Sequence, residues 1–185
     1  MRAFTTFSGL LVGVLLLIVG GANIGAAADQ VIRVTPLTRD GTVFITFEAD
    51  AAIDRDLEQT IQSGLPTTFS YDVELGRASA LWFDRSVGSA TVAATVRYDN
   101  LTRRYNVYLL QDGRVLETHP TDSAAAVTQL VSSFHRLPLF TTKQLQANTE
   151  YYVRVRGRTR PRRSWLVFLW DRPSAFGSAK FTFLG

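Results

Sequence analysis

The chain has 185 residues, no cysteine and a formal net charge of +4 at pH 7. This length suits one ordinary domain that buries a sizeable core, and the lack of cysteine excludes disulfides and thiolate metal sites. The basic excess is local, because six arginines lie between Arg154 and Arg163 and acidic residues would otherwise outnumber basic ones. The composition therefore argues against a nucleic-acid-binding protein, which is typically basic over a whole domain.

The N-terminal segment has the three parts of a secretory signal. Arg2 provides a basic start, an apolar run follows from Leu10 to Gly20, and small residues lead to Ala26-Ala27-Ala28. This order is typical of an export signal whose cleavage after Ala28 leaves Asp29 as the mature N-terminus. We therefore expect an exported protein, periplasmic or extracellular.

The alternative is that this segment is retained as a membrane anchor. A spanning helix needs about 20 apolar residues, and residues 7–28 reach that length. Gly20, Gly21, Asn23 and Gly25 interrupt the apolar run, however, and no basic cluster follows it. The interpretation is a signal peptide over residues 1–28 and a single domain over residues 29–185.

The first part of the domain predicts two strands and a helix. Asp40-Gly41 favours a tight hairpin between a short β-like run at 30–35, ended by Pro36, and an alternating strand at 42–48. A helix is predicted over 51–63, because apolar residues recur there at every fourth position. Its cap is Asp50, its C-terminal stop signals are Gly64 and Pro66, and its buried stripe comprises Ile53, Leu57 and Ile61.

The segment 67–75 alternates cleanly and predicts a strand with two unlike faces. Its core face is apolar and comprises Phe69, Tyr71, Val73 and Leu75. Its other face is polar and acidic and comprises Ser70, Asp72 and Glu74.

The second half predicts more strands and one further helix. Segments 89–98, 103–110 and 114–118 form an antiparallel meander, in which Asp112-Gly113 is the strongest hairpin signal. A helix begins at Thr121 or Asp122, runs to about His135 and is ended by Pro138, with an apolar face of Val127, Leu130, Val131 and Phe134. Strands at 151–160, 165–170 and 178–184 complete the chain. The predicted fold is mainly β, an antiparallel β-sandwich-like single domain with two short helices.

Several segments from about residue 60 onward resemble a known bacterial family. The most specific is RYDNLTRRYNV at 97–107; the others are SGLPTTF and DVE between 63 and 74, LWFD at 81–84, LPL at 137–139 and YVRVR at 152–156. Together they resemble the exported bacterial family called domain of unknown function DUF4390. The chain departs from that pattern at 157–163, where arginines crowd, and at its C-terminal end. The resemblance implies export and a single domain, and it implies no activity.

The arginine-rich segment is the main candidate for function. Side chains alternate between faces along a strand, so its arginines share one face of the predicted strand 151–160. The candidate binding patch comprises these arginines and the residues that follow, Arg154, Arg156, Arg158, Arg160, Arg162, Arg163, Trp165 and Trp170. Basic charge beside tryptophan suits a lipid headgroup boundary. The alternative is a solvated strand face that is partly paired with Asp72 and Glu74.

Motifs for catalysis or metal binding are missing from the sequence. His119 and His135 have no metal-ligand spacing, no G-x-S-x-G surrounds Ser89, and no glycine-rich phosphate loop occurs. We therefore predict no catalytic, cofactor or metal residues. Leu81-Trp82-Phe83 is interpreted as a plug of the sandwich end, with a binding anchor as the alternative.

The leading hypothesis is a non-catalytic cell-envelope protein that binds a protein partner or an anionic membrane surface through residues 154–170. Export disfavours nucleic acid as the partner, and the oligomeric state is left open. The rival hypothesis is a hydrolase of an envelope polymer that uses carboxylates such as Asp72 and Glu74. An enzyme needs a concave pocket where titratable groups converge, whereas a binding module needs an exposed patch.

Overall fold

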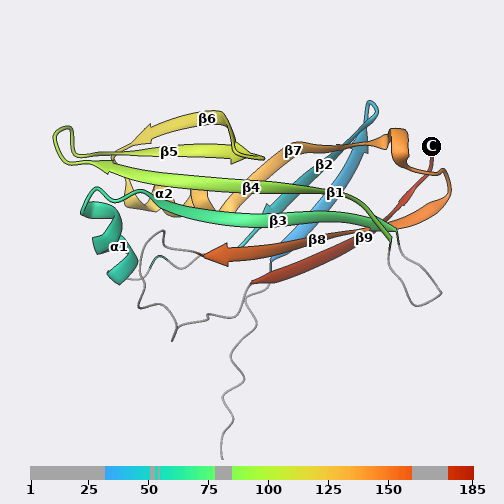
Figure 1. The fold of residues 1–185 in the computed structure, drawn as a ribbon, viewed down its shortest axis with the longest axis horizontal. Helices are drawn as coiled ribbons and strands as arrows, with labels where there is room; N and C mark the ends of the chain where they lie inside the picture. Colours follow the sequence, from blue (N-terminus) through green and yellow to red (C-terminus); the bar gives the residue numbers. More distant parts are fainter. Residues whose placement is uncertain (1–31, 51–52, 54, 78–84, 160–174) are drawn as a thin grey trace, which may run out of the picture.

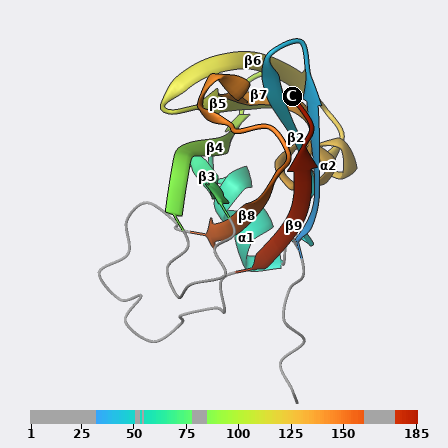
Figure 2. The ribbon, with the colours of Figure 1, turned by 90° about the vertical axis from the view of Figure 1, so that its right-hand side faces the viewer.

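Two antiparallel sheets pack face to face in the computed structural model, with the helices α1 (Arg55–Gln62) and α2 (Ala124–Ser132) toward one end (Figure 1). The structure describes residues 32–50, 53, 55–77, 85–159 and 175–185. Seen along the long axis, the larger sheet curves from β4 through β3 and β8 to β9, which lies beside β1 of the smaller sheet (Figure 2). The predicted sandwich-like β fold with two helices is confirmed.

The larger sheet has six strands in the order β6-β5-β4-β3-β8-β9. Their bounds are β3 Thr67–Arg77, β4 Arg85–Asp99, β5 Arg104–Gln111, β6 Arg114–Thr121, β8 Thr149–Thr159 and β9 Phe176–Phe183. The predicted meander corresponds to β4, β5 and β6, although β4 begins at Arg85, so that Ser89 lies inside the strand and not at its start. Asp112 and Gly113 have φ values of 49° and 79°, as a two-residue hairpin turn with both φ angles positive requires.

The smaller sheet has three strands in the order β1-β2-β7. Their bounds are β1 Arg33–Arg39, β2 Thr42–Glu48 and β7 Ser133–Thr141. The expectation that the first strand ends at Pro36 is wrong, because β1 continues through Pro36 to the hairpin at Asp40-Gly41. Pro36 lies in β1 and Pro138 in β7, the two outer strands of this sheet, where a missing N–H need not interrupt the ladder.

The second predicted helix is shorter than expected, and a strand replaces its end. Helix α2 spans Ala124–Ser132, and its N-cap is Ser123, whose Oγ accepts a hydrogen bond from the Ala126 amide at 3.3 Å. Neither Thr121 nor Asp122 is the cap. Phe134 and His135 belong to β7, so His135 is not at a helix end as expected. Phe134 fits the helical spacing of the preceding residues, yet it enters the core from a strand.

The first helix is also shorter than predicted in the described part of the chain. Helix α1 spans Arg55–Gln62, so Ile53 precedes it while Leu57 and Ile61 pack against the core. The predicted stop at Gly64 is confirmed, because this residue has a φ of +84°, a conformation that favours glycine after a helix. A 3-10 turn, η1 Thr142–Gln144, follows β7.

Three aromatic rings join the two sheets at the centre of the core. The ring centroids of Phe47 and Phe134 are 4.7 Å apart, and that of Tyr71 lies 5.2 Å from both. The Tyr71 hydroxyl donates a hydrogen bond to the Val131 carbonyl at 2.7 Å. Burial raises the pKa of Tyr71 to about 12, because the charged phenolate is disfavoured away from water.

Strand β1 of the smaller sheet meets β9 of the larger one, as the end view shows (Figure 2). The Ile32 amide donates to the Phe176 carbonyl at 3.0 Å. A Cβ atom at Gly177 would overlap the Ile32 carbonyl, so only glycine allows this close approach. The described chain therefore enters the fold directly beside Phe176.

Neither helix in the described ranges is long and apolar enough to cross a bilayer. The predicted signal cleavage residues Ala26, Ala28 and Asp29 lie outside the described residues, as do Leu81-Trp82-Phe83 and the predicted strand 165–170.

Candidate functional site: an arginine row on the larger sheet

Strand β8 has an apolar face and a basic face. Val153 and Val155 are fully buried on the side of the smaller sheet, while Arg154 is half-buried and Arg156 and Arg158 are exposed on the outer side. The predicted alternation is confirmed over the described residues. We call Arg154, Arg156 and Arg158 the arginine row. The other members of the predicted patch lie outside the described residues, namely Arg160, Arg162, Arg163, Trp165 and Trp170.

Strand β3 brings its acidic face alongside the arginine row. The register places Glu74 opposite Arg154 and Asp72 opposite Arg156. Arg154 Nη1 lies 3.7 Å from Glu74 Oε2, and Arg158 Nη2 lies 2.6 Å from Asp72 Oδ2. The two carboxylate side chains are about one-third exposed, at 35% and 33%. The arginine row is therefore partly neutralised by the strand beside it.

Arg156 differs from its two neighbours in the row. It lies opposite Asp72 on one side, yet the Asp72 carboxylate binds Arg158. On the other side it faces Phe176 of β9, a residue that is 46% exposed. Within the described ranges, Arg156 forms no ion pair, so its guanidinium is exposed and available.

Arg154 is held by aromatic rings as well as by Glu74. Its guanidinium carbon lies 4.9 Å from the Tyr152 ring centroid and 6.0 Å from that of Phe176, within the range of cation–π attraction. The Tyr152 ring itself covers Gly76 on β3, where a Cβ atom would overlap it. Arg154 is thus a fixed part of the face, whereas Arg156 is the exposed arginine of the row that forms no ion pair with the described residues.

The sequence predictions missed Tyr152 and Phe176 as parts of this site. Tyr152 lies two residues before Arg154 in β8, so the alternation of a strand already places it on the same face as the arginines. Phe176 preceded the predicted last strand, which begins two residues earlier than expected. Its pairing with Arg156 depends on the long-range register between β8 and β9.

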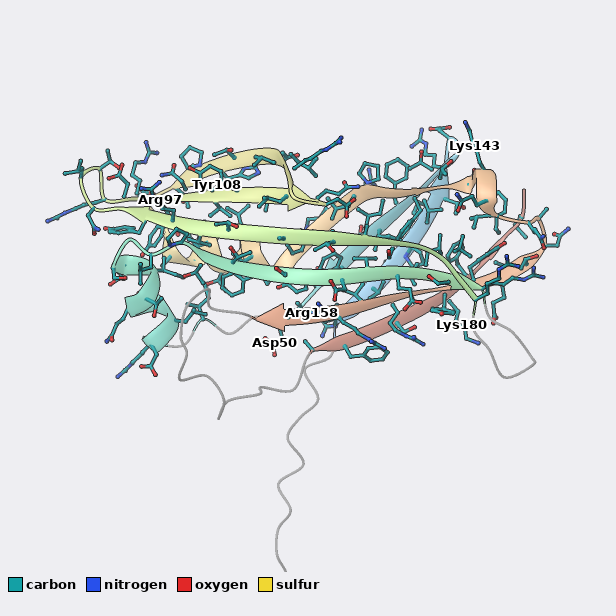
Figure 3. The ribbon with its side chains drawn as sticks, in the orientation of Figure 1. Asp50, Arg97, Tyr108, Lys143, Arg158 and Lys180 are labelled. Carbon is teal, nitrogen blue, oxygen red and sulfur yellow. The ribbon has the colours of Figure 1, made fainter. Side chains whose placement is uncertain are left out.

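Lys180 of β9 extends the basic side chains of this region, and it pairs with Glu150 at 2.9 Å. Figure 3 shows Arg158 and Lys180 on the two lower strands, whereas Arg97 and Tyr108 lie over β4 and β5. The basic side chains from β8 and β9 therefore lie near the β9 edge of the larger sheet, at the opposite end of the strand order from β6.

The carboxylates proposed for hydrolysis do not line a pocket that described residues form under the helices. That pocket has a volume of about 170 Å³ and lies between α1, α2 and β5, with Glu58, Ile61, Tyr105 and Val127 among its lining residues. Asp72 and Glu74 instead lie on the outer sheet face in ion pairs with arginine. No group of three or more metal-ligating side chains occurs in the described part of the chain.

The two histidines lie on different strands. His119 in β6 contacts Glu117, with Nε2 2.8 Å from Oε2. His135 in β7 contacts the hydroxyl of Ser133 at 3.0 Å. Each therefore has a local polar partner on its own strand.

Comparison with known proteins identifies the family of the chain. No curated protein and no solved structure matches it. A family model matches residues 26–164, a range that includes β1 to β8 and the whole arginine row. The chain belongs to the family described as a domain of unknown function, DUF4390.

Proposed function

We propose that the protein is an exported, non-catalytic binding module of the cell envelope. Its binding surface is the outer face of β3, β8 and β9, and its partner is anionic. The observation that carries this proposal is the exposed guanidinium of Arg156, which lies between two arginines that already engage the neighbouring acids. An anionic partner would supply the counter-charge that the sheet itself does not.

The charges of this face support an anionic partner. Four cations, Arg154, Arg156, Arg158 and Lys180, face three anions, Asp72, Glu74 and Glu150. The sequence then adds Arg160, Arg162 and Arg163 before the next acidic residue, Asp171. The excess of positive charge therefore grows along the chain in this region.

The N-terminal signal supports a location in the envelope and so restricts the choice of partner. Outside the cytoplasm, the common polyanions are lipid headgroups, envelope polymers and acidic protein surfaces. A signal peptide over residues 1–28 and a periplasmic or extracellular location therefore belong to the same proposal. Nucleic acid does not fit this location.

The rival function is hydrolysis of an envelope polymer through Asp72 and Glu74. Such chemistry needs a carboxyl group that delivers a proton inside a concave site. Both side chains are instead paired with guanidinium groups on a sheet face. The ion pairs support binding over hydrolysis.

Retention of residues 29–185 by fractions of the native envelope tests the binding proposal. This segment contains the whole described fold, which begins at Ile32. We compare the wild type with Arg156→Gln and with the matched control Arg114→Gln, which removes the same charge from β6 at the opposite edge of the same sheet. We expect Arg156→Gln to weaken retention by about fivefold, since one basic residue near an anionic surface contributes about 1 kcal/mol.

The wild type and Arg114→Gln should bind alike, and salt should release both, because exposed charges are screened. Equal retention of all three proteins would contradict the proposal. So would retention that does not respond to salt.

A further inference from the structure

We infer that the anionic partner is a phospholipid membrane, and that Arg156 and Phe176 meet it where the N-terminal segment joins the fold. This inference rests on the proposed function and adds to it the class of partner. It also gives the protein an orientation, with the β8–β9 side toward the lipid and the β6 edge away from it.

The first argument is the chemistry of the exposed pair. Arg156 on β8 and Phe176 on β9 are directly opposite in the register, and both side chains are exposed. A guanidinium beside an aromatic ring matches a membrane interface, where phosphate groups lie above an apolar layer. A purely polar anionic polymer would meet the arginine but would leave the ring of Phe176, a residue that is 46% exposed, without an apolar partner.

The second argument is the position at which the N-terminal segment leaves the described fold. Ile32 is the first described residue, and its amide binds the Phe176 carbonyl. The overlap that a Cβ atom at Gly177 would make with the Ile32 carbonyl shows how closely the two strands approach there. The segment that carries the export signal thus joins the fold beside the exposed pair.

The length of the intervening chain adds to this argument. The apolar run ends at Gly20, and the residues from there to Ile32 span at most about 40 Å when fully extended. Before the signal peptide is cleaved, while its apolar segment is in a membrane, Ile32 and the neighbouring Phe176 are therefore held within about this distance of the end of that segment. Binding of the tethered face is then intramolecular, which raises its effective concentration.

The opposite edge of the sheet provides an internal comparison. Strand β6 also carries an arginine beside exposed apolar side chains, Arg114 next to Val115 and Leu116. Its position at the far edge of the six-stranded order separates it from the junction at Ile32. If residue type alone decided membrane contact, both edges would bind the membrane. The N-terminal segment joins the fold at Ile32, beside β9, so we expect the β8–β9 side to be the one that binds.

The experiment uses the natural lack of cysteine in the full chain. Single cysteines replace two exposed residues, Ser178→Cys on β9 and Thr118→Cys on β6, and each carries a fluorophore. The full chain is reconstituted in vesicles of phosphatidylcholine, with or without phosphatidylglycerol, that contain nitroxide-labelled headgroups. We expect the probe at 178 to be quenched in the anionic vesicles and the probe at 118 to remain unquenched in both.

Two variants test the residues that carry the inference. Arg156→Gln and Phe176→Ser should each reduce quenching at 178, and Arg114→Gln should leave it unchanged. Co-sedimentation of residues 29–185 with the same vesicles should show binding that needs phosphatidylglycerol and falls about fivefold in Arg156→Gln. Circular dichroism checks whether each variant keeps its strand content.

Equal quenching at 178 and 118, or quenching at 178 that ignores phosphatidylglycerol, would overturn the orientation toward anionic lipid. If residues 29–185 bind no vesicles but a soluble envelope fraction still retains them in an Arg156-dependent way, the lipid inference fails and the proposed function stands. If Arg156 matters to neither, both fail.

Discussion

The two faces of the β3–β8 pair are one residue apart in sequence and differ in what they need from their surroundings. On the inner face, Tyr71 and Val155 are buried among side chains of both sheets. On the outer face, Asp72 and Arg158 form an ion pair that is still partly exposed to water. Burial of apolar side chains stabilises the inner face, whereas the outer face carries opposite charges that form exposed ion pairs.

This difference separates structural from functional residues in the same strands. A packed core tolerates few changes in volume, because its contacts are close on all sides. An exposed ion pair contributes little to stability, so its residues can change or exchange partners at small cost. A binding surface on the outer face can therefore vary while the sandwich beneath it stays intact.

The largest expected effect is on the inner face. Phe47→Ala should lower the free energy of unfolding by about 3–5 kcal/mol, because it opens a cavity between the two sheets. Phe47 is fully buried and contacts the Phe134 and Tyr71 rings. Urea unfolding followed by circular dichroism measures the change, and Phe176→Ala is the control on an exposed ring. Equal losses in the two variants would contradict the difference between the faces.

Tyr71→Phe tests the hydroxyl at the centre of the core. At neutral pH it should cost about 1 kcal/mol, because the Val131 carbonyl loses its donor. The effect of pH on the stability difference between the wild type and Tyr71→Phe is larger than this neutral-pH cost. The folded state keeps Tyr71 neutral up to its raised pKa of about 12, whereas the unfolded chain loses the proton above its ordinary value of 10.0.

The stability that Tyr71 contributes is therefore present below pH 10 and is lost as the pH rises toward about 12. The rise in the pKa of Tyr71 from 10.0 to about 12 corresponds to about 3 kcal/mol. In urea unfolding across this range, the wild type should lose its advantage over Tyr71→Phe and then become the less stable of the two. If the free energy of unfolding fell in parallel with pH for both proteins, Tyr71 would not be the cause of the loss of stability.

The smallest effect on stability is expected on the outer face. Asp72→Asn combined with Glu74→Gln removes the acidic partners of Arg158 and Arg154 and should cost about 0–1 kcal/mol for each pair. Binding to anionic vesicles should become tighter, because two negative charges leave the face. Co-sedimentation and urea unfolding measure the two effects. Weaker binding, or loss of a hydrolytic activity on envelope polymer, would favour the rival function.

Local signals in the sequence predicted most strands correctly, and the exceptions have clear causes. Alternation identified the two faces of β3 and β8, and Asp112-Gly113 identified the β5–β6 hairpin. Strand β7 was missed because Phe134 fits both the helical spacing from Val127 and a position in a strand. Its pairing with β2, where Phe134 lies opposite Phe47, is a contact between residues far apart in sequence.

In the candidate site, too, some features follow from the local sequence and others depend on contacts between distant segments. The grouping of Arg154, Arg156 and Arg158 on one face follows from the two-residue period of a strand, and the structure confirms it. The order β3-β8-β9 decides which side chains lie beside them, because Glu74 and Phe176 reach Arg154 through separate strand pairings. No local pattern in the sequence predicts that strand order.

By itself, the sequence determined the alternating faces, the tight hairpins and the local excess of arginine, because each depends on residues within a few positions of one another. The tertiary structure alone decided that, among the described residues, Arg156 has no ion pair while its neighbours are paired, and that Ile32 meets Phe176 beside it. Both depend on register between distant segments, which is set by how the two sheets bury their common core.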